Sequence, residues 1–455
     1  MAPHASAKGS SRPFLRQRLP LSVVAKSTGA ACNLDCEYCF FLSKELLYDA
    51  PRQQMDDDTL RDYIVEFLAA SNDGEVMMLW QGGEPTLRGL PFFRRVVELA
   101  DEYRRPRQKV THAIQTNATL IDEEWAAFLA EQDFLVGVSI DGPAHLHDAY
   151  RKNRGGRGTY DMVARGYRLL QRAGVLTNIL CTVNAANQHS GVEIYRHFRD
   201  DLGAQYLQFI PIVERVNDKD LPVAEAGWRT ASGERLLYRQ EGAAVTSRSV
   251  DPMAYGQFLT EIFEEWVQHD VGAVFIQDLD AALSAMFGIH PVCVHAPQCG
   301  NNVAMEFNGD VYACDHWVEP DWRLGSIREK SFAELVSTDT MREFSKKKNL
   351  QLTQQCRRCP HLRMCQGGCP KDRFMTSIDG EEGQNYLCPG YFHFYSSIRP
   401  DLVVMARLVR ANRAPAEILD PQVRNRLRPS ARCPFHRGIC HDHISVGHSI
   451  ADFIA

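Results

Sequence analysis

The sequence predicts an α/β fold: a partial (β/α)6 TIM-like barrel followed by a smaller cysteine-rich domain. Residues 20–213 alternate short β-branched runs with longer amphipathic stretches, and this order repeats six times. Such repetition is typical of a parallel sheet curled into a barrel or part of one. Beyond residue 290 cysteines and turns dominate. We therefore expect the barrel over 20–289 and the second domain over 290–410, with a flexible extension over 1–19 and a poorly ordered tail over 411–455.

The predicted strands are short and rich in β-branched residues, as in parallel sheets that are buried on both faces. The predicted helices carry apolar residues three and four positions apart, the spacing of one buried helix face. Strands are expected at 21–26, 76–81, 110–116, 134–140, 176–183 and 206–212, and helices at 57–70, 91–103, 123–131, 160–173 and 193–202. A polar insertion at 216–251, a helix at 255–268 and a strand at 273–277 are expected after them.

Composition argues against several classes of function. The 455 residues carry a formal net charge of -6, so the chain lacks the basic surface that a nucleic-acid-binding protein needs. No run of about 20 apolar residues and no signal-peptide pattern occurs, so we expect a cytoplasmic protein without a membrane partner. Fourteen cysteines in a reducing compartment indicate metal or cluster binding rather than a disulfide framework.

The first predicted strand leads into the segment CNLDCEYC, where Cys32, Cys36 and Cys39 have the spacing C-x3-C-x2-C. A [4Fe-4S] cluster usually takes four thiolates, one for each iron. Only three are local here, because the next cysteine is Cys181. One iron would therefore be open to a small molecule. A three-cysteine zinc site completed by a distant ligand, or free buried thiols, are the alternatives.

Three more motifs follow the second, third and fourth predicted strands. QGGEP places two residues without side chains where backbone passes close to a ligand, and then Glu84, a carboxylate able to receive a cationic amine. A tight turn with Pro85 starting the next helix is the simpler alternative. QTN at 115–117 and SIDGP at 139–143 are weak signals singly, since both suit loops. Because barrel chemistry collects at the C-terminal ends of the strands, we expect all four motifs to lie together.

Eight further cysteines lie in the C-terminal domain. They run C-x5-C-x14-C from Cys293 and C-x2-C-x5-C-x3-C-x18-C from Cys356. Eight thiolates complete two four-cysteine sites, which would suit two more cubane clusters without an open position. Two structural zinc sites would satisfy the same count.

Together these motifs resemble the radical S-adenosylmethionine (radical SAM) family, in its branch with a SPASM domain. Residues 20–410 resemble the anaerobic sulfatase-maturating enzymes more closely, through WQGGEPTL, FLVGVSIDGP, QFIPIVERV, CDHWVEPDWRLG and GGCPKDRF. The resemblance implies three [4Fe-4S] clusters as cofactors. SAM would bind the free iron of the first cluster and be cleaved there to methionine and a 5'-deoxyadenosyl radical.

The resemblance also implies the residues of each site. The SAM pocket would contain Gly83 and Glu84 at the methionyl amine and Arg151 at the carboxylate, although Arg151 is otherwise read as a solvated loop arginine. The other pocket residues would be Tyr38, Gln81, Asn117, Ser139 and Val213. The cluster ligands would be Cys32, Cys36 and Cys39 for the SAM-binding cluster, Cys293, Cys299, Cys314 and Cys369 for one auxiliary cluster, and Cys356, Cys359, Cys365 and Cys388 for the other.

In this family the radical removes a hydrogen atom from Cβ of a cysteine or serine in a Cys/Ser-x-Pro-x-Arg sulfatase peptide, and the product is Cα-formylglycine. The implied partners are an unfolded or nascent sulfatase and an electron donor such as flavodoxin or ferredoxin, and the auxiliary clusters take up the second electron. The implied base is Asp315, directly after a cluster ligand, and we expect burial and the anionic cluster to raise its pKa. Asp278, Asp280 and His316 are the reserve candidates.

Two positions depart from the family pattern. Ala118 stands where glycine usually follows QTN, and Phe41 stands where some relatives carry tyrosine.

Two other functions also remain open. The first is maturation of another ribosomally made peptide. The second is a non-enzymatic metal-binding or electron-carrier protein, which would leave the open iron unexplained. The tail residues Cys433, Cys440, His441 and His443 form either a metal site or part of a disordered end.

Overall fold

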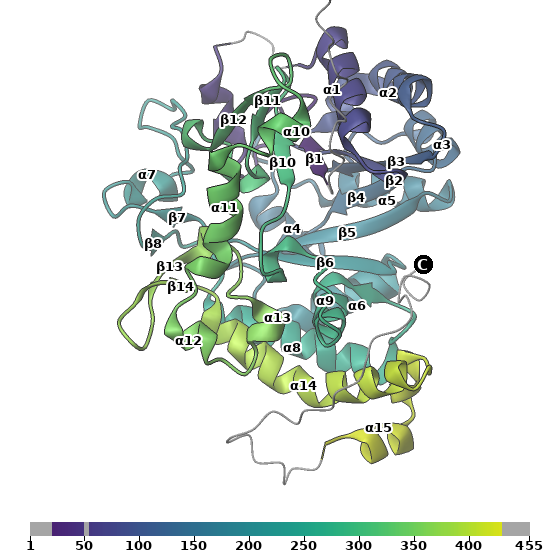
Figure 1. Ribbon diagram of the computed structural model, residues 1–455, viewed down its shortest axis with the longest axis vertical. Coiled ribbons are helices and arrows are strands. Elements are labelled where there is room, and N and C mark those ends of the chain that lie inside the picture. Colours follow the sequence, from purple (N-terminus) through teal and green to yellow (C-terminus); the bar gives the residue numbers. More distant parts are fainter. Residues whose placement is uncertain (1–20, 50–53, 430–455) are drawn as a thin grey trace, which may run out of the picture.

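The computed structural model describes residues 21–49 and 54–429, and one sheet of ten strands forms its centre (Figure 1). The strand order is β12-β11-β10-β1-β2-β3-β4-β5-β6-β9. Neighbours from β10 through β1 to β9 pair in parallel, whereas β11 and β12 pair antiparallel at one edge. The run from β1 to β6 in sequence order is the predicted partial barrel, so the predicted fold class is confirmed.

The barrel alternates strands and helices as the sequence predicts. Its strands are β1 (Ser22–Ala25), β2 (Gly74–Trp80), β3 (Gln108–Thr116), β4 (Leu135–Ser139), β5 (Leu176–Val183) and β6 (Tyr206–Pro211). Its helices are α1 (Asp57–Ala70), α2 (Gly89–Tyr103), α3 (Glu123–Glu131), α4 (Ala144–Tyr150), α5 (Tyr160–Arg172) and α6 (Gly191–Arg196), with the short turns η1 (Leu42–Leu47) and η2 (Pro85–Arg88). Helix α4 was not predicted. The helix expected at 193–202 divides into α6 and the π-helical turn η3 (His197–Asp201).

Aromatic side chains fill the space between the sheet and helices α1 and α2. Trp80, at the end of β2, is fully buried and meets Tyr63 of α1 edge-on at 5.6 Å between ring centres. It also meets Phe92 and Phe93 of α2 at 5.6 and 5.9 Å. Edge-to-face pairs of this kind add to the burial of large apolar surfaces. This packing fixes the end of β2, from which the QGGEP segment continues.

The cysteine-rich domain shares the sheet of the barrel. Strand β10 lies parallel to β1, with Ala25 opposite Met305, so Lys26 and Glu306 follow the two strand ends side by side. The strands of this part are β10 (Asn302–Met305), β11 (Asp310–Tyr312), β12 (Arg323–Ser326), β13 (Arg373–Thr376) and β14 (Glu382–Asn385). Its helices and turns are η4 (Cys293–His295), η5 (Asp315–Trp317), η6 (Pro320–Trp322), α10 (Phe332–Leu335), α11 (Asp339–Leu350), α12 (Gln354–Arg357), α13 (Leu362–Cys365), η7 (Pro370–Asp372) and α14 (Cys388–Arg410).

Helix α14 packs against α8 (Pro252–His269) through two glycines (Figure 1). A Cβ atom added to Gly390 would lie 1.9 Å from the carbonyl oxygen of Pro252, and one added to Gly256 would lie 2.3 Å from that of Gly390. Such approaches are possible only where no side chain separates the backbones. The contact joins the C-terminal domain to the barrel.

The polar insertion expected at 216–251 is partly packed rather than fully exposed. It contains β7 (Arg215–Val216), α7 (Leu221–Glu225) and β8 (Ala244–Val245), and Tyr238 within it is buried. Arg229 and Arg235 donate to opposite oxygens of Asp35 at 3.1 and 2.9 Å. The insertion therefore covers one side of the first cysteine loop. After α8, the expected strand at 273–277 is the two-residue β9 (Phe275–Ile276), and α9 (Gln277–Ala285) follows it.

The prediction of poor order was wrong for residues 411–429. These residues form η8 (Pro415–Leu419) and α15 (Pro421–Leu427). Asp401 of α14 accepts paired hydrogen bonds from Arg424 at 2.9 and 2.7 Å and from Arg428 at 2.8 and 2.6 Å. Arginines that look solvated in the sequence thus share one buried carboxylate. The extension over 1–19 and the tail cysteines and histidines lie outside the described residues.

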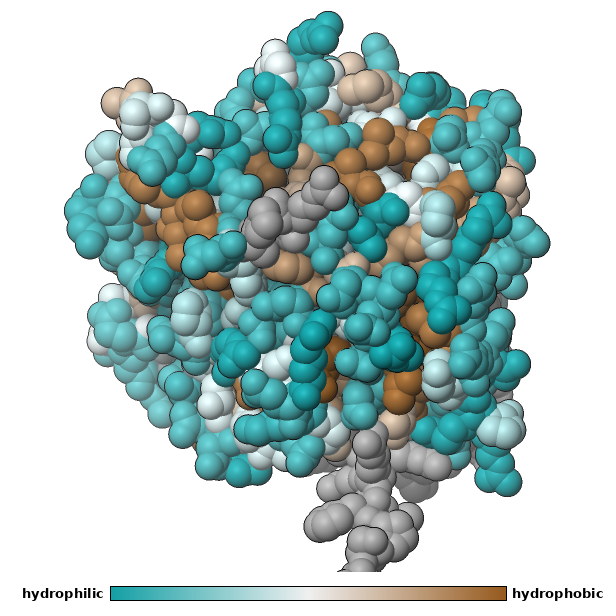
Figure 2. Space-filling model, turned by 90° about the horizontal axis from the view of Figure 1, so that it is seen from above, coloured by the Kyte–Doolittle hydropathy of each residue, from teal (hydrophilic) through white to brown (hydrophobic). Residues whose placement is uncertain are grey.

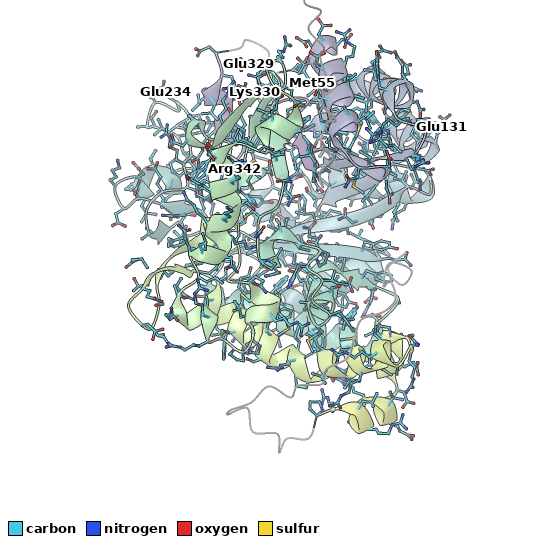
Figure 3. All side chains as sticks on the ribbon, in the orientation of Figure 1. Met55, Glu131, Glu234, Glu329, Lys330 and Arg342 are labelled. Atoms are coloured by element: carbon cyan, nitrogen blue, oxygen red, sulfur yellow. The ribbon has the colours of Figure 1, made fainter. Side chains whose placement is uncertain are left out.

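The surface is mainly polar. The face in Figure 2 is largely hydrophilic, with smaller apolar patches between charged side chains. Glu131 and Glu234 point outward at opposite sides of the molecule in Figure 3, and both are exposed. Within residues 21–49 and 54–429, none of the helices combines the length and apolar character that crossing a bilayer requires.

Candidate active site

The first cysteine loop lies beyond the C-terminal end of β1 and is held by the backbone of residues 150–154. The Asp35 N–H donates to the carbonyl of Lys152 at 2.9 Å, and the Glu37 N–H donates to that of Tyr150 at 3.1 Å. Arg154 Nη2 donates to the carbonyl of Cys32 at 2.7 Å. These bonds fix the path of the loop against the segment that follows α4.

The three thiols of this loop are crowded and shielded from water. Burial raises the pKa of Cys32 and of Cys36 to about 12. The charges of Cys32 and Cys39 raise the pKa of Cys36 further, whereas Arg151 lowers it. Thiolates in such a place need the positive charge of a bound metal. The donor set therefore fits an iron-sulfur cluster.

The two glycines of QGGEP allow this segment to touch the cysteine loop. Gly83 has a φ of 46°, and a Cβ atom on it would lie 2.1 Å from the carbonyl oxygen of Ala31. Gly82 has a φ of 104°, and a Cβ atom there would lie 2.2 Å from Cδ of Lys26. Both positions therefore require glycine for conformational and steric reasons. The glycines thus fit against the protein's own chain, and a close approach of this backbone to a ligand stays a prediction.

Glu84 is buried directly beyond these glycines. Its Oε1 accepts bonds from the Thr86 N–H at 3.0 Å, from the Thr86 hydroxyl at 2.6 Å and from Thr116 at 2.7 Å. Its Oε2 accepts a bond from the Asn117 N–H at 2.7 Å. Burial still leaves the pKa of Glu84 above its usual value, and the Glu84 charge raises the pKa of Cys32. The carboxylate is thus rigidly oriented beside the first cysteine.

Arg151 is not a solvated loop arginine, because it is buried against Asp141 of the SIDGP motif. Its Nε donates to Asp141 Oδ2 at 3.0 Å. The Tyr38 hydroxyl donates to the same oxygen, and the Thr182 N–H donates to Oδ1 at 3.0 Å. The role of Asp141 was not predicted, because an Asp-Gly-Pro sequence also suits a simple loop. A buried carboxylate between two predicted pocket residues orients both of them.

The remaining predicted pocket residues also lie at the C-terminal edge of the sheet. Asn117 Nδ2 donates to Asn33 at 2.9 Å and approaches the Cys32 sulfur at 3.8 Å. Ser139 accepts a bond from Gln115 at 2.9 Å. The Gln81 N–H donates to Ala25 at 3.1 Å, and Val213 is buried just beyond β6. The structure therefore brings the strand-end motifs together as the sequence predicts.

The structure corrects the expectation for Asp315. Its carboxylate forms a salt bridge with Lys26, which is buried at the end of β1. Burial acts to raise the pKa of Asp315, but Lys26 and His316 outweigh it, so the pKa lies below its usual value. The protein's own groups therefore shift this pKa opposite to the expected direction, because the counter-ion comes from a distant part of the chain; the effect of an anionic cluster on it stays a prediction. No local sequence pattern pairs residues 289 positions apart.

Glu306 is a second buried carboxylate near this pair. Burial raises its pKa to about 8, an effect that Lys26 opposes and Asp315 reinforces. Its Oε1 has no hydrogen-bond partner among the described residues. Phe41 packs its ring 4.3 Å from Lys26 Nζ. Lys26 and Glu306 were missed because each looks like an ordinary residue after a strand.

Four C-terminal cysteines lie near one another, and we call Cys293, Cys299, Cys314 and Cys369 the first quartet; the first, second and fourth of them lie near Lys348. Lys348 is fully buried and donates to the carbonyls of Cys293 and Val294. Burial lowers the pKa of Lys348, and the charges of Cys299, Cys369 and Cys293 oppose that shift. Burial likewise raises the pKa of Cys314, and Cys369 and Cys293 add to the rise. Lys348 was not predicted as a site residue, because it lies in a run of lysines that resembles a solvated helix face.

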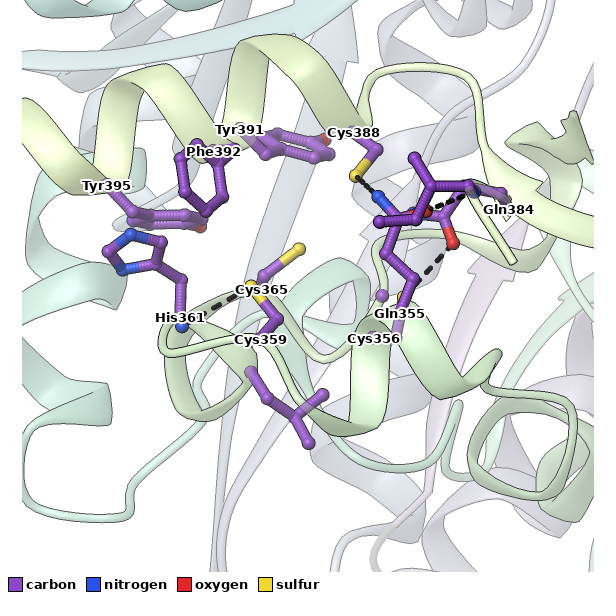
Figure 4. Close-up of a pocket in the computed structure, with 13 residues that line it drawn as sticks. Gln355, Cys356, Cys359, His361, Cys365, Gln384, Cys388, Tyr391, Phe392 and Tyr395 are labelled. Carbon is purple, nitrogen blue, oxygen red and sulfur yellow. Dashed lines mark hydrogen bonds between the residues drawn. The ribbon is translucent and has the colours of Figure 1, made fainter. Parts of the chain in front are cut away.

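The other four cysteines, Cys356, Cys359, Cys365 and Cys388, line one cavity of about 190 Å³ (Figure 4). We call them the second quartet. Burial raises the pKa of Cys365 to about 12, and the other three members add to the rise. Among the described residues, no three His, Cys, Asp or Glu side chains are close enough to hold a single metal ion. A cavity between four thiols fits a polynuclear cluster.

The reserve candidates for the base lie in other surroundings. Asp278 and Asp280 are on α9, and burial raises the pKa of each to about 7. The Asp278 charge acts on Tyr255 and Tyr395, away from the Lys26 pair. His316 has its ring 5.6 Å from that of Phe40, and burial lowers its pKa to about 4.

Comparison with known proteins agrees with this arrangement. The radical SAM superfamily profile matches residues 27–196, and the profile of the SPASM iron-sulfur cluster-binding domain matches residues 293–360. A serine-type anaerobic sulfatase-maturating enzyme of Bacteroides thetaiotaomicron is 40% identical over 90% of this chain and 95% of its own length. A cysteine-type enzyme of Clostridium perfringens is 32% identical over 86% of this chain and 100% of its own length. The solved structure of anSMEcpe with bound AdoMet has a TM-score of 0.74 and 31% identity, and covers 85% of this chain and 100% of that one.

The fold and the site define a radical SAM protein with a C-terminal SPASM domain. Within that class, the chain belongs to the family of anaerobic sulfatase-maturating enzymes. The family predicted from the sequence is therefore confirmed.

Proposed function

We propose that this chain oxidises a serine or cysteine of a sulfatase peptide to Cα-formylglycine, using SAM, one SAM-binding [4Fe-4S] cluster and two auxiliary clusters. When bound, SAM and its cluster would provide the radical that removes a hydrogen atom from Cβ of the target residue, and the auxiliary clusters would accept an electron. The ion pair between Lys26 and Asp315 carries the proposal, because it places an ionised carboxylate directly after a candidate cluster ligand. Membership of the sulfatase-maturating family supports the peptide substrate.

The residues of the chain would divide these tasks. Cys32, Cys36 and Cys39 would hold the first cluster, and the first and second quartets would hold the auxiliary clusters. Gly83, Glu84 and Arg151 would bind the polar end of SAM, and Tyr38, Gln81, Asn117, Ser139 and Val213 would complete its pocket. The close backbone contact at Gly83 and the buried bond from Arg151 to Asp141 support this assignment.

Asp315 would take the proton of the target hydroxyl or thiol. A carboxylate must be ionised to accept a proton, and Lys26 keeps Asp315 ionised at neutral pH. Lys26 is fully buried, so its charge is little screened by water. Neutral His316 is directly adjacent and can relay the proton onward.

We further propose a cytoplasmic location, an electron donor such as flavodoxin or ferredoxin, and no nucleic-acid or membrane partner. The net charge of -6 and the lack of a long apolar run in the sequence support the last two points. Both substrate types are proposed, because serine-type and cysteine-type enzymes are both similar to this chain.

The test incubates the anaerobically reconstituted full chain with SAM, a reductant and peptides containing Ser-x-Pro-x-Arg or Cys-x-Pro-x-Arg. We expect a formylglycine mass change on at least one peptide. In Asp315→Asn we expect SAM cleavage to persist while formylglycine falls at least about 100-fold, as for loss of a general base. Asp321→Asn, an exposed aspartate nearby, should retain the yield. SAM cleavage with neither peptide altered would instead favour maturation of another ribosomally made peptide.

A further inference from the structure

The cavity of the second quartet has two glutamine side chains in its wall (Figure 4). Gln355 lies on α12 and Gln384 lies on β14. Neither residue has a part in the reaction described above. Both amides nevertheless lie against cysteine sulfur atoms of the quartet.

Gln355 presents its amide N–H group to Cys388. Its Nε2 lies 3.8 Å from the Cys388 sulfur. Its Oε1 accepts a bond from the Ile378 N–H at 2.9 Å. A backbone N–H can only donate, so the carbonyl oxygen of Gln355 must face Ile378. The orientation of the amide is therefore determined, and the N–H group faces the sulfur.

Gln384 lies between Cys356 and Cys388. Its Oε1 accepts bonds from Thr353 at 2.6 Å and from the Cys356 thiol at 3.6 Å. Its Nε2 is buried and has no hydrogen-bond partner among the described residues. Burial raises the pKa of Cys388 to about 11, and the nearby Gln384 amide opposes that rise. In this orientation Gln384 keeps an unpaired N–H group in the wall of the cavity that Cys388 also lines.

Binding of a cluster would not remove this N–H group from the cavity. A cysteine bound to iron has no S–H proton, so the Cys356 sulfur then requires a donor rather than an acceptor. Rotation of the Gln384 amide by half a turn presents Nε2 to Cys356, and the Thr353 hydroxyl can accept instead of donate. In either orientation, one cysteine of the second quartet faces the amide nitrogen of Gln384.

We propose that Gln355 and Gln384 donate hydrogen bonds to the thiolate sulfurs of the cluster held by the second quartet, and thereby raise its reduction potential. This inference rests on the ligand set of the proposed function. One-electron reduction adds a negative charge to the cluster, and N–H donors at the sulfurs stabilise that charge. The electron comes from the oxidised substrate during the reaction and from dithionite in a titration.

The two glutamines distinguish this cluster from the first auxiliary site. Buried Lys348 is a charge near the first quartet. Arg373 acts on cysteines of both quartets, including Cys356 and Cys369, so it shifts both clusters in the same direction. The contacts of Gln355 and Gln384 described above involve only the second quartet. Their replacement should therefore move one potential and leave the other unchanged.

The experiment is a redox titration of the full-length protein loaded with all clusters, followed by electron paramagnetic resonance. The SAM-binding cluster is recognised because added SAM changes its signal, and Cys365→Ala identifies the cluster of the second quartet by its loss. Gln384→Leu and Gln355→Leu are compared with Gln354→Leu, which replaces an exposed glutamine on the same helix as Gln355. Iron content and visible spectra are measured for each variant.

We expect Gln384→Leu and Gln355→Leu each to lower the reduction potential of the second-quartet cluster and of no other cluster. A tenfold fall in the ratio of reduced to oxidised cluster corresponds to about 59 mV for a one-electron couple. Unchanged potentials, or equal shifts in all clusters or in Gln354→Leu, would overturn the proposal. If Gln384→Leu loses the cluster, Gln355→Leu decides the question. Retention of every cluster in Cys365→Ala would instead refute the ligand set, which is a failure of the proposed function.

Discussion

Lys26 and Asp315 form a partly buried salt bridge between the end of the first barrel strand and the turn after β11, and the two residues are 289 positions apart in the sequence. The pairing depends on β10, which lies parallel to β1 and brings the cysteine-rich domain against the mouth of the barrel. Lys26 thereby supplies a positive charge at a place where the sequence predicts only a base and a cluster. The charge state of the proposed base is therefore set by the barrel.

Replacing Lys26 should change the pH dependence of peptide oxidation. In Lys26→Met the pKa of Asp315 should rise, because burial raises this pKa and the main counter-ion that lowers it is lost. The rise of formylglycine yield with pH should then move to higher pH, while SAM cleavage continues. Mass spectrometry of the peptide from pH 6 to pH 9 measures this shift. Lys44→Met removes another buried lysine, paired with Glu319, and an equal shift in that variant would contradict a specific role for Lys26.

Replacing Asp141 should weaken SAM binding. Asp141→Asn keeps the shape of the side chain but leaves the Arg151 guanidinium buried without its counter-ion. Breaking a buried pair costs on the order of 3–5 kcal/mol of stability, and misplacement of Arg151 should raise the Kd for SAM about tenfold. Equilibrium binding of SAM to the reconstituted protein measures the effect. Asp401→Asn breaks another buried aspartate–arginine contact and should lower stability without changing SAM affinity.

A methyl group on Gly83 should lower the stability of the protein and its affinity for SAM. Gly83→Ala places a Cβ atom 2.1 Å from the carbonyl oxygen of Ala31 and also imposes a positive φ on alanine. We expect a loss of roughly 1–3 kcal/mol from backbone strain alone, together with lower SAM affinity. Gly74→Ala is the matched control, because Gly74 has a φ of 97° but no atom within 4 Å of its added Cβ. Similar SAM affinities in the two variants would show that the close approach has no effect on binding.

Glu306 should make the protein less stable as pH rises. Its folded-state pKa of about 8 lies above the ordinary value, so the folded protein holds this proton more tightly than the unfolded chain. The contribution is favourable at low pH and is lost as pH rises toward 8. Glu306→Gln should therefore gain stability over the natural protein, by on the order of a few kcal/mol at pH 9, with little difference near pH 5. Melting temperatures of both proteins test this, with exposed Glu329→Gln as the control. A constant difference across pH would contradict the assignment.

Most of the barrel could be predicted because its signals are local. The ends of α1 and α3 and the whole of β5 agree with the expected ranges, since their apolar spacing is regular and Asp56 and Asp122 cap the two helices. Helix α4 escaped prediction because its seven residues are too short for a periodic pattern. The π-helical turn after α6 has no known signal in the sequence.

The departure from the family pattern at Ala118 has a structural consequence. It adopts a left-handed φ of 54° and is fully buried. The glycine usual in the family avoids that strain, which costs alanine roughly 1 kcal/mol. Gly166 approaches closely, since a Cβ atom there would lie 2.1 Å from the Ala118 carbonyl oxygen. The backbone of Ala118 thus fits in this place because residue 166 has no side chain.

The sequence by itself determined the family, the fold class and the places where the chemistry lies. Thiol spacing and strand-end motifs are local features, and the C-terminal ends of parallel strands must share one edge. Only the tertiary structure decided which charges surround those places. Lys26 at Asp315 and Lys348 at Cys293 come from distant segments, and Asp141 meets Arg151 through the fold of the segment after β4. Burial makes such charges decisive, because a low dielectric magnifies each pairing and no residue pattern encodes it.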